Sequence, residues 1–400
     1  MVLTCLAMSL ETEIHADHYQ ARYEGLQEKI FRLILEEERG SVWVSLLRVI
    51  ATLTAWFYDK MATLRNLLFD RGVLRIHRFN CPVISVGNLT MGGTGKTPMV
   101  VWLASLFSKE GYRVGIVSRG YGGVESSRVI VVSDGDNILA EQSVSGDEPL
   151  MLARRLQGIP VLCSRKRAKA ARAAIENFKC NTLILDDGFQ HRYLARDLDI
   201  VLLDARSPFG SGKLFPRGTL REKGAALARA HVLVLSRFDQ SEDAEKNCHN
   251  LRGQWPDKAV VTASHRPVRI FSAFDHGERP LTSLAELRLA AFAGIARPHD
   301  FFQTVQNLGA RLVYTAALPD HCPLTCELLA SLVREASKVR PELWLTTEKD
   351  WVRLPQVLPQ DMELWVMAME IDLDRDGSQL VGMVLRTLRG VSLGSEDFKG

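Results

Sequence analysis

The 400-residue sequence has no long block of lysine or arginine, and its formal net charge is only +3. Proteins that bind nucleic acid along their surface usually carry a basic patch or stripe, so no nucleic-acid partner is expected. Internal repeats and low-complexity segments are also missing from the sequence. With 46% hydrophobic and 24% charged residues the composition is globular, and the length suggests roughly two or three domains.

Cysteine is scarce, since the chain has only seven, an odd number, and they are scattered. Cys322 and Cys326 are the one close pair, and no second pair completes a zinc site. The pattern predicts structural thiols in a reduced compartment. The first 20 residues lack the basic segment of a secretory signal peptide, and their short apolar run is followed by acidic residues, so we expect no signal peptide there.

Residues 41–60, SVWVSLLRVIATLTAWFYDK, are strongly apolar. On a helix their polar side chains form one narrow stripe, and Trp43 and Trp56 lie near the ends, where amphipathic rings favour a membrane interface. The apolar stretch is close to the lower limit of about 17 residues for a membrane span. Arg48 in its middle would cost a spanning helix about 2.5 to 3.5 kcal/mol.

Basic residues outnumber acidic ones just beyond this stretch, with Asp59 and Asp70 against Lys60, Arg65, Arg71, Arg75 and Arg78. A basic flank beside an apolar helix suits the anionic cytoplasmic leaflet of a membrane. We therefore expect residues 41–80 to dock on a membrane surface. Two alternatives stay open: a helix buried in the core, as very apolar helices often are, and a true span.

The segment before this helix, residues 11–39, is rich in charge. Its larger apolar residues recur at helical spacing, at Tyr19, Tyr23, Leu26, Ile30 and Leu33. We expect residues 1–40 to form a helical extension.

From Pro82 onward, short β-rich runs alternate with helical ones. Strand patterns cover 82–87, 113–123, 128–135, 160–164, 182–187, 199–205 and 231–239, and helical patterns cover 97–111, 148–158 and 166–178. This alternation predicts an α/β fold with a doubly wound, mainly parallel sheet over residues 81–262. A smaller α/β lobe is expected over 263–375, followed by a closing helix and tail over 376–400.

The run NLTMGGTGKTPMV, residues 88–100, directly follows the first strand pattern. A glycine-rich turn that opens a helix cradles phosphates with its backbone N–H groups. Lys96 would reach the β- and γ-phosphates, and Thr97 would place its hydroxyl on Mg²⁺. The usual phosphate-loop pattern has glycine where Thr90 stands, but the later glycines still let the backbone approach an anion. The predicted nucleotide-binding residues of the loop are Met91, Gly92, Gly93, Thr94, Gly95, Lys96, Thr97 and Pro98.

Two carboxylates, Asp186 and Asp187, end the strand pattern TLILDD. Adjacent carboxylates repel each other, so placing two side by side is favourable chiefly when a cation lies beside them. Asp186 and Asp187, together with Thr97, are therefore the predicted metal ligands. The alternative is a solvated turn, since Asp-Gly is a common turn dipeptide. Asp147 and Glu148 begin a helical pattern, where physical chemistry alone favours helix capping over catalysis.

Other charged residues have weaker signals. The run SRKRAKAARAA, residues 164–174, reads mainly as the solvated face of a helix, although an arginine near its start suits a phosphate. The loop SPFGSGKLFPRGTLRE supplies Arg221 and Glu222 as functional candidates, with ordinary ion pairs as the alternative. His321 follows Asp320 in the second lobe, and a lone histidine is more often structural than catalytic.

Taken in order, seven motifs resemble the tetraacyldisaccharide 4'-kinases, the lipid A 4'-kinases of Gram-negative bacteria. They are VGNLTMGGTGKTP, SRGYGG, GDEPLMLARR, DDGFQHRYLARDLDIVLLDA, GTLRE, PDH and TTEKDWVRL. The resemblance runs from about Arg71 to Asp350, and the first and fourth motifs are the most specific. Thr90 belongs to the family's version of the loop. The fold that the resemblance implies is P-loop NTPase-like, with an N-terminal membrane-associated helix.

The resemblance also implies a reaction and roles. ATP would phosphorylate the 4'-hydroxyl of a glucosamine disaccharide that bears four acyl chains and a 1-phosphate, the lipid A precursor, with Mg²⁺ as cofactor. Asp147 would be the base, supported by His321, and Gln190 would help to organise the nucleotide. The residues implied to line the phosphoryl-transfer and head-group region are Glu148, Arg167, Arg221 and Glu222.

Location follows from the chemistry of this acceptor. Each acyl CH₂ taken from a bilayer costs about 0.8 kcal/mol, so the enzyme must work at the membrane, and its use of ATP indicates the cytoplasmic face of the bacterial inner membrane. A membrane-associated nucleotide switch is a rival hypothesis, although the guanine-reading NKxD motif is missing after HVLVLSRFD. A lipid-binding protein without activity is a third, and intact Lys96 and Thr97 argue against it.

Overall fold

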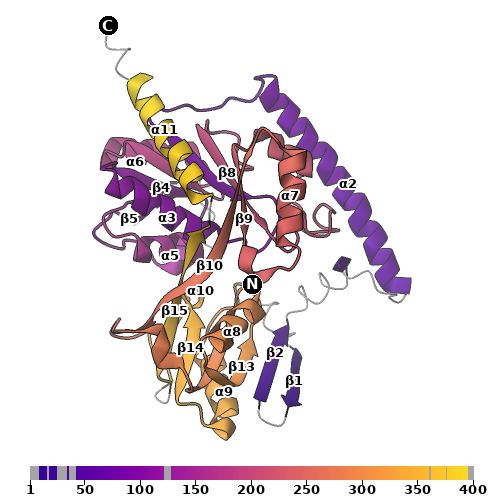
Figure 1. Cartoon of the computed structure of the whole chain (residues 1–400), viewed down its shortest axis with the longest axis vertical. Helices are drawn as coiled ribbons and strands as arrows, with labels where there is room; N and C mark the ends of the chain where they lie inside the picture. The colour runs from indigo at the N-terminus through magenta and orange to yellow at the C-terminus, as the bar shows by residue number, and fades with distance from the viewer. Residues whose placement is uncertain are drawn as a thin grey trace. The chain divides into compact units, whose positions relative to one another are not determined.

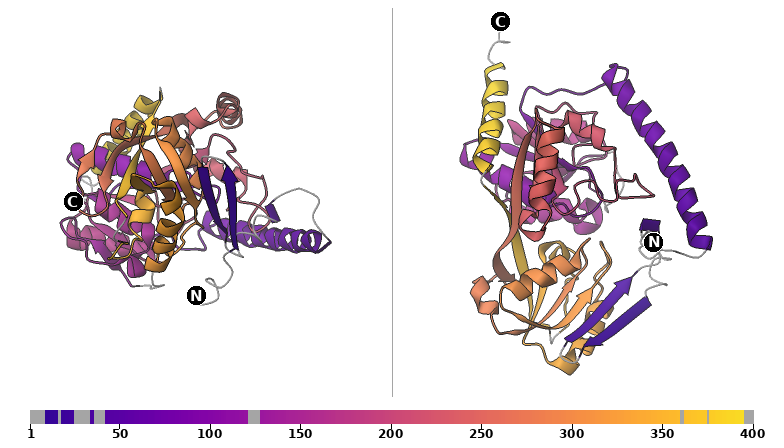
Figure 2. Two further views of the ribbon diagram at one scale, coloured as in Figure 1. Left: turned by 90° about the horizontal axis from the view of Figure 1, so that it is seen from below. Right: turned by 45° about the vertical axis from the view of Figure 1, so that its right-hand side comes forward.

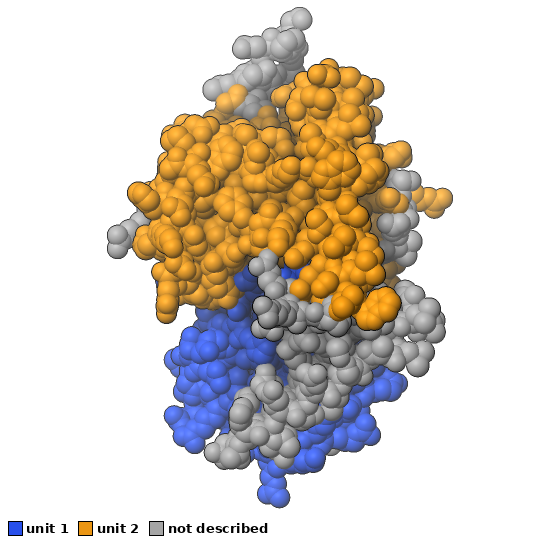
Figure 3. Space-filling model, turned by 90° about the vertical axis from the view of Figure 1, so that its right-hand side faces the viewer, with its two compact units in different colours: residues 1–36, 266–370 blue, residues 37–265, 371–400 orange. Residues whose placement is uncertain are grey.

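The computed structural model describes residues 9–15, 18–24, 34–35, 42–120, 128–359, 362–374 and 376–394. The chain forms two compact units, shown in different colours in Figure 3. Unit 1 comprises residues 1–36 and 266–370, and unit 2 comprises residues 37–265 and 371–400. The chain passes between the units in strand β10 (Ala259–Ser272) and again near the end of strand β15 (Leu364–Leu373).

Unit 2 contains a sheet with the strand order β10-β9-β8-β3-β7-β4-β6-β5. Its other strands are β3 (Val83–Asn88), β4 (Val114–Ser118), β5 (Ile130–Ser133), β6 (Val161–Cys163), β7 (Thr182–Asp186), β8 (Leu198–Asp204) and β9 (Val232–Ser236). All neighbours are parallel except β5, which pairs antiparallel with β6 at one edge. Order and direction agree with the doubly wound, mainly parallel α/β fold that the sequence predicts.

Helices cover both faces of this sheet (Figure 1). They are α3 (Lys96–Lys109), α4 (Gln142–Ser145), α5 (Asp147–Arg155), α6 (Arg167–Phe178), α7 (Ala244–Gln254) and α11 (Gly377–Gly394), with 3₁₀ helices η2 (Gly224–Arg229) and η3 (Phe238–Gln240). One apolar cluster joins the strands to α6 and includes Val117, Leu162 and Ala170. Another joins them to α7 and includes Val201 and Leu251. Burial on both faces explains why the strand sequences are almost continuously apolar.

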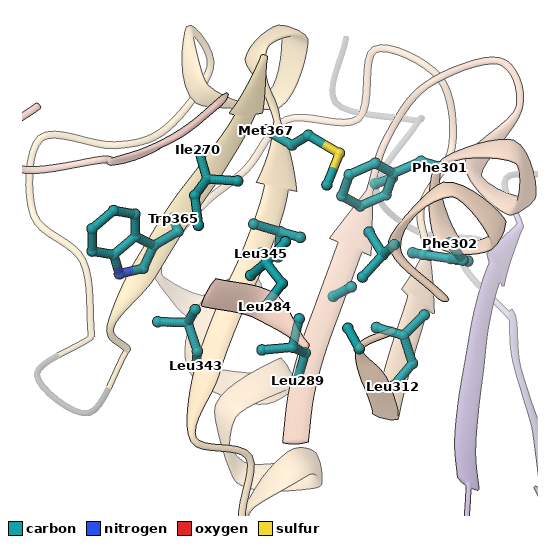
Figure 4. Packing of buried hydrophobic residues seen from close by; sticks show 14 of the residues in the cluster. Ile270, Leu284, Leu289, Phe301, Phe302, Leu312, Leu343, Leu345, Trp365 and Met367 are labelled. Carbon is teal, nitrogen blue, oxygen red and sulfur yellow. The ribbon is translucent and has the colours of Figure 1, made fainter. Parts of the chain in front are cut away.

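Unit 1 is a second α/β unit with the strand order β1-β2-β13-β12-β14-β15. Its elements are β1 (Ser9–His15), β2 (His18–Glu24), β11 (Glu278–Arg279), η4 (Leu281–Leu284), β12 (Arg288–Ala293), α8 (Pro298–Asn307), β13 (Arg311–Ala317), α9 (Cys326–Ala336), η5 (Ser337–Val339), β14 (Leu343–Thr347) and α10 (Glu348–Trp351). Figure 4 shows Phe301 and Phe302 of α8 packed with Leu289, Leu345 and other core residues of the strands. A separate cluster holds α9.

The N-terminal segment corrects a prediction. Residues 9–15 and 18–24 form an antiparallel hairpin, and β2 adds parallel to β13, whereas we expected a helix. Tyr19 and Tyr23 are four residues apart, a spacing that fits two strand repeats as well as one helical turn. The other residues of that expected helix, Leu26, Ile30 and Leu33, lie outside the described residues, as does the end of the SRGYGG motif.

Helix α2 (Val42–Asp70) is 29 residues long and lies along the outside of unit 2 (Figure 2). It is long and apolar enough to cross a membrane. Only 11% of its most apolar 18-residue window is buried against the rest of the protein. Trp43 and Trp56 are 75% and 61% exposed. Burial is limited to one stripe that includes Ala51, Ala55 and Asp59. The alternative of a core helix is therefore wrong.

The six cysteines in the described part of the chain are free thiols, and all except Cys326 are buried. Burial raises the pKa of Cys81 to about 12, with the nearby charge of Asp197 adding to the effect. Such thiols stay protonated and unreactive at neutral pH, in agreement with the structural role that the sequence predicts.

Candidate functional site

The glycine-rich loop joins β3 to α3 in unit 2. Strand β3 ends at Asn88 and helix α3 begins at Lys96, so the loop leads directly into a helix N-terminus. Gly92 and Gly95 have φ angles of 104° and 87°, in the left-handed region that side chains disfavour. The Asn88 amide donates to Thr94 Oγ1 over 3.1 Å, which ties the two ends of the loop together. This is the geometry of an anion cradle.

The backbone conformation of Thr90 explains why this position of the loop does not require glycine. Thr90 forms an antiparallel bridge with Leu220, so it has an extended conformation and needs no glycine. On either side of it, Met91 N donates to Thr219 O over 2.7 Å and Arg221 N donates to Leu89 O over 2.9 Å. The GTLRE segment is therefore hydrogen-bonded to the start of the phosphate loop.

Asp186 is the last residue of β7 and is almost fully buried. Its Oδ2 accepts from Ser118 Oγ over 3.0 Å, while its Oδ1 is buried and makes no hydrogen bond within the described structure. Burial raises the pKa of Asp186 to about 7, and the negative charges of Glu148 and Asp187 add to this effect. A buried carboxylate oxygen without a partner suits a cation.

Asp187 is surrounded by positive charge. Arg221 Nη1 lies 2.8 Å from both carboxylate oxygens, and Lys96 Nζ lies 3.5 Å from Oδ1. Arg167 donates to the backbone oxygen of Asp187 over 2.8 Å. Burial alone would raise the pKa of this carboxyl, but Lys96, Arg221 and Arg167 hold it well below its usual range. Asp187 therefore remains ionised.

Asp147 begins helix α5 and is buried. Its Oδ1 accepts from Gln142 Nε2 over 2.7 Å, which fixes the orientation of the carboxylate. The next residue, Glu148, is close enough to raise the pKa of Asp186. Helix α5 also contacts α3, the helix that begins with Lys96. The N-terminus of α5 thus belongs to the same region as the phosphate loop and the paired aspartates.

Gln190 and Glu222 make contacts that support the loop. Gln190 Nε2 donates to the backbone oxygen of Asn88 over 2.9 Å. Glu222 is buried and forms ion pairs with Arg65, over 2.9 Å, and with Arg229. Both residues therefore have structural partners in this site.

His321 belongs to unit 1, whereas the residues above belong to unit 2. Its Nε2 lies 3.2 Å from Lys349 Nζ and 3.9 Å from Asp320, and Lys349 pairs with Asp320 over 2.8 Å. The TTEKDWVRL motif builds this corner. Thr347 caps helix α10, and the buried Asp350 accepts from Gly294 N and Arg353.

Arg237 is a site residue that the sequence did not reveal. It follows β9, is buried, and donates from Nη2 to Gly93 O over 2.5 Å and from Nη1 to Asp204 over 2.8 Å. Asp204 ends the neighbouring strand β8. The sequence did contain a signal for Arg237. Asp204 and Arg237 stand at or just after the carboxyl ends of adjacent parallel strands, and such ends meet at one edge of the sheet, where ligands bind.

A glycine loop that leads from a central parallel strand to Lys96 and Thr97, beside carboxylates on the adjacent strand end, defines a P-loop nucleotide-binding protein. Comparison with known proteins identifies the group. Residues 47–389 match the family model of tetraacyldisaccharide-1-P 4'-kinase. The chain belongs to that family. The family, its kinase activity and the P-loop-like fold predicted from the motifs are thereby confirmed.

Individual relatives agree. A tetraacyldisaccharide 4'-kinase of Anaeromyxobacter dehalogenans strain 2CP-C is 44% identical over 300 residues, which are 74% of this chain and 79% of that relative. One from Chlorobium phaeovibrioides is 38% identical over 349 residues, covering 83% and 95%. The crystal structure of LpxK from Aquifex aeolicus in complex with ATP is similar with a TM-score of 0.67 and 31% identity, covering 84% of this chain and 97% of that one.

Proposed function

We propose that this chain transfers the γ-phosphoryl group of ATP to the 4'-hydroxyl of a tetraacyl glucosamine disaccharide 1-phosphate, a step of lipid A biosynthesis. The hydroxyl oxygen bonds to the γ-phosphorus, the bond to the bridging oxygen of ADP breaks, and the hydroxyl proton leaves to a base. Family membership supports the reaction, and the Aquifex aeolicus relative was crystallised with ATP, which supports the donor.

The observation that carries the proposal is the convergence of Lys96, Arg221 and Arg167 on Asp187 beside the glycine-rich loop. Phosphoryl transfer requires positioning and neutralisation of the charge on the γ-phosphate. Arg221 has several N–H donors, so it can hold Asp187 and still donate to a phosphate oxygen. The loop residues Met91 to Pro98, with Gln190 behind Asn88, would bind the nucleotide.

Asp147 is the base in this proposal. A sugar hydroxyl is a weak nucleophile until a carboxylate accepts its proton. Gln142 orients the Asp147 carboxylate at the start of α5, and the acidic neighbour Glu148 lies near Asp186. His321 would support the base from unit 1, and Glu148, Arg167, Arg221 and Glu222 would form or support the head-group region.

Mg²⁺ is the cation that these residues fit. Among the described residues there is no group of three or more His, Cys, Asp or Glu side chains that could hold a metal ion by themselves. Mg²⁺ does not require one, since it usually binds one or two carboxylates together with waters and substrate phosphates. The free Oδ1 of Asp186 and the hydroxyl of Thr97 would hold it beside Asp187, and the bound ion would neutralise charge on the phosphates.

The enzyme would work as a peripheral or monotopic protein on the cytoplasmic face of the inner membrane. Its acceptor cannot leave the bilayer cheaply, at about 0.8 kcal/mol per CH₂. Helix α2 presents exposed apolar side chains along most of its length, including Trp43 and Trp56. ATP is available on the cytoplasmic side, which sets the leaflet.

The test is a transfer assay with purified tetraacyl disaccharide 1-phosphate, ATP and Mg²⁺, comparing wild type with Asp147→Asn. We expect phosphorylated lipid only with the acceptor present, and a loss of about 10²- to 10⁴-fold in kcat for Asp147→Asn because the base is removed. Asp136→Asn, which changes an exposed carboxylate after β5, is the matched control. ATP hydrolysis that ignores the lipid, or an Asp147→Asn enzyme as fast as the control, would overturn the proposal.

A further inference from the structure

Three consecutive residues after the phosphate-loop bridge are each bonded to helix α2. The Tyr58 hydroxyl donates to the backbone oxygen of Arg221 over 2.9 Å. Arg65 lies 2.9 Å from Glu222, and Lys223 lies 2.8 Å from Asp59. Tyr58 and Arg65 are about two helical turns apart and so lie on the same side of α2, and Asp59 directly follows Tyr58. Helix α2 thus makes one contact with each of the residues 221–223.

The same residues are bonded to the nucleotide site. Arg221 N donates to Leu89 O at the start of the phosphate loop, and the Arg221 guanidinium pairs with Asp187. One residue therefore receives a contact from α2 on its backbone oxygen and supplies a cation to the site from its side chain. Helix α2 therefore contacts Arg221, one of the residues proposed to neutralise the γ-phosphate, directly.

Glu222 makes this connection stiff. Its side chain is only 4% exposed and lies between Arg65 of α2 and Arg229 of η2. Arg229 in turn lies over the ring of Phe189, 4.8 Å from its centroid, in the turn that follows Asp187 and Gly188. A buried carboxylate that loses one of its cationic partners is left with uncompensated charge, so removal of Arg65 should displace this loop.

We propose that Tyr58 and Arg65 are positioning residues for phosphoryl transfer, which act through Arg221 by holding residues 221–223 against the phosphate loop. This inference rests on the proposed kinase function. It gives α2 two roles: its exposed apolar side chains face the membrane, and its polar side chains Tyr58, Asp59 and Arg65 set the position of an active-site cation. The Asp59–Lys223 pair adds a third contact of the same kind.

The test is a double-mutant cycle on kcat, with ATP saturating and the acceptor presented in detergent micelles so that membrane binding does not limit the rate. Tyr58→Phe and Arg65→Gln are each made in wild type and in Arg221→Ala. Residues in one network give non-additive effects. We expect each α2 variant to lower kcat by about tenfold in wild type and by less than about twofold in Arg221→Ala. Arg65→Lys keeps the charge and should recover most of the loss.

Lys246→Gln on helix α7 is the control, because it removes a positive charge from a side chain that is 74% exposed and has no role in the site or on α2. It should leave kcat unchanged. Equal losses in both backgrounds, or a rise in the acceptor KM with kcat unchanged, would overturn the inference, since either shows a role that does not pass through Arg221. Tyr58→Phe removes only one hydroxyl and serves if Arg65→Gln is unstable. A wild type without acceptor-dependent transfer would instead refute the proposed function.

Discussion

Asp187 is the residue at which the charges of this site meet. Its backbone has a φ of 51°, an unusual conformation for a residue with a side chain, and it is held there by Arg167 on its backbone oxygen and by Arg221 and Lys96 on its carboxylate. Such strain persists only where the surroundings determine it, and it is concentrated at functional sites. A fixed, ionised Asp187 keeps Lys96 and Arg221 in place before a nucleotide arrives.

His191, in the same motif, makes a pH-dependent contribution to stability. Burial lowers its pKa to about 3, and the positive charges of Arg167 and Arg196 add to this. The unfolded chain binds the proton with a pKa near 6.5. Between these values the unfolded state binds more protons, so the free energy of unfolding falls as the pH drops below 6.5, by at most about 1.4 kcal/mol per unit.

Thermal unfolding measured from pH 7.5 to 5 checks this prediction. The wild type should lose melting temperature more steeply on acidification than His191→Gln, whose side chain does not titrate. His249→Gln, at an exposed position of α7, should follow the wild type. Parallel curves for wild type and His191→Gln would show that His191 does not become charged on unfolding.

At the scale of elements, α2 is the helix whose surface most needs an explanation. Its exposed apolar side chains cover far more than single scattered residues, and such patches mark interaction sites. Replacing both Trp43 and Trp56 with Ser should weaken binding to vesicles of phosphatidylglycerol and phosphatidylethanolamine by about tenfold or more, because two large apolar surfaces no longer enter the interface.

Vesicle sedimentation measures this loss. Phe274→Ser removes an exposed aromatic side chain from unit 1 and should bind as the wild type does. Unchanged partitioning of the Trp43→Ser, Trp56→Ser double variant would contradict docking of α2 on the membrane through these two side chains.

The sequence predicted the central elements well and the N-terminal ones poorly. Strands β3, β7, β8 and β9 are buried on both faces, so their largely apolar runs predicted strands without ambiguity. The pattern around Tyr19 and Tyr23 fits both a helix and a strand, and pairing with β13, nearly 300 residues later, decides the outcome. Local patterns contain no information about that partner.

The residues of the site divide in the same way into those that the sequence could predict and those that it could not. Lys96, Thr97, Asp186 and Asp187 are predicted from local motifs, because the phosphate and metal binding proposed for them would need these residue types at fixed spacing. Arg237, Gln142 and Ser118 act through partners that are distant in sequence or on other elements, at Gly93, Asp147 and Asp186. Only the fold brings such pairs together.

At the scale of the whole molecule, the nucleotide-site residues are concentrated in unit 2. The phosphate loop, the paired aspartates, Arg221 and Asp147 all belong to it, together with helix α2. Unit 1 contains the His321–Lys349–Asp320 cluster, and the support of Asp147 by His321 stays a prediction. Unit 1 also has a buried polar pair of its own, in which Arg353 donates to the carboxylate of Asp350.

The most direct measurement is transfer of labelled γ-phosphate from ATP to tetraacyl disaccharide 1-phosphate by wild type, Lys96→Ala and Lys109→Ala. Lys109 is exposed at the other end of α3 and serves as the control. We expect label on the 4'-oxygen of the acceptor with wild type and Lys109→Ala, and a rate lower by about 10²- to 10³-fold with folded Lys96→Ala. Near-normal transfer by Lys96→Ala, or label at another position, would contradict a phosphate-loop 4'-kinase.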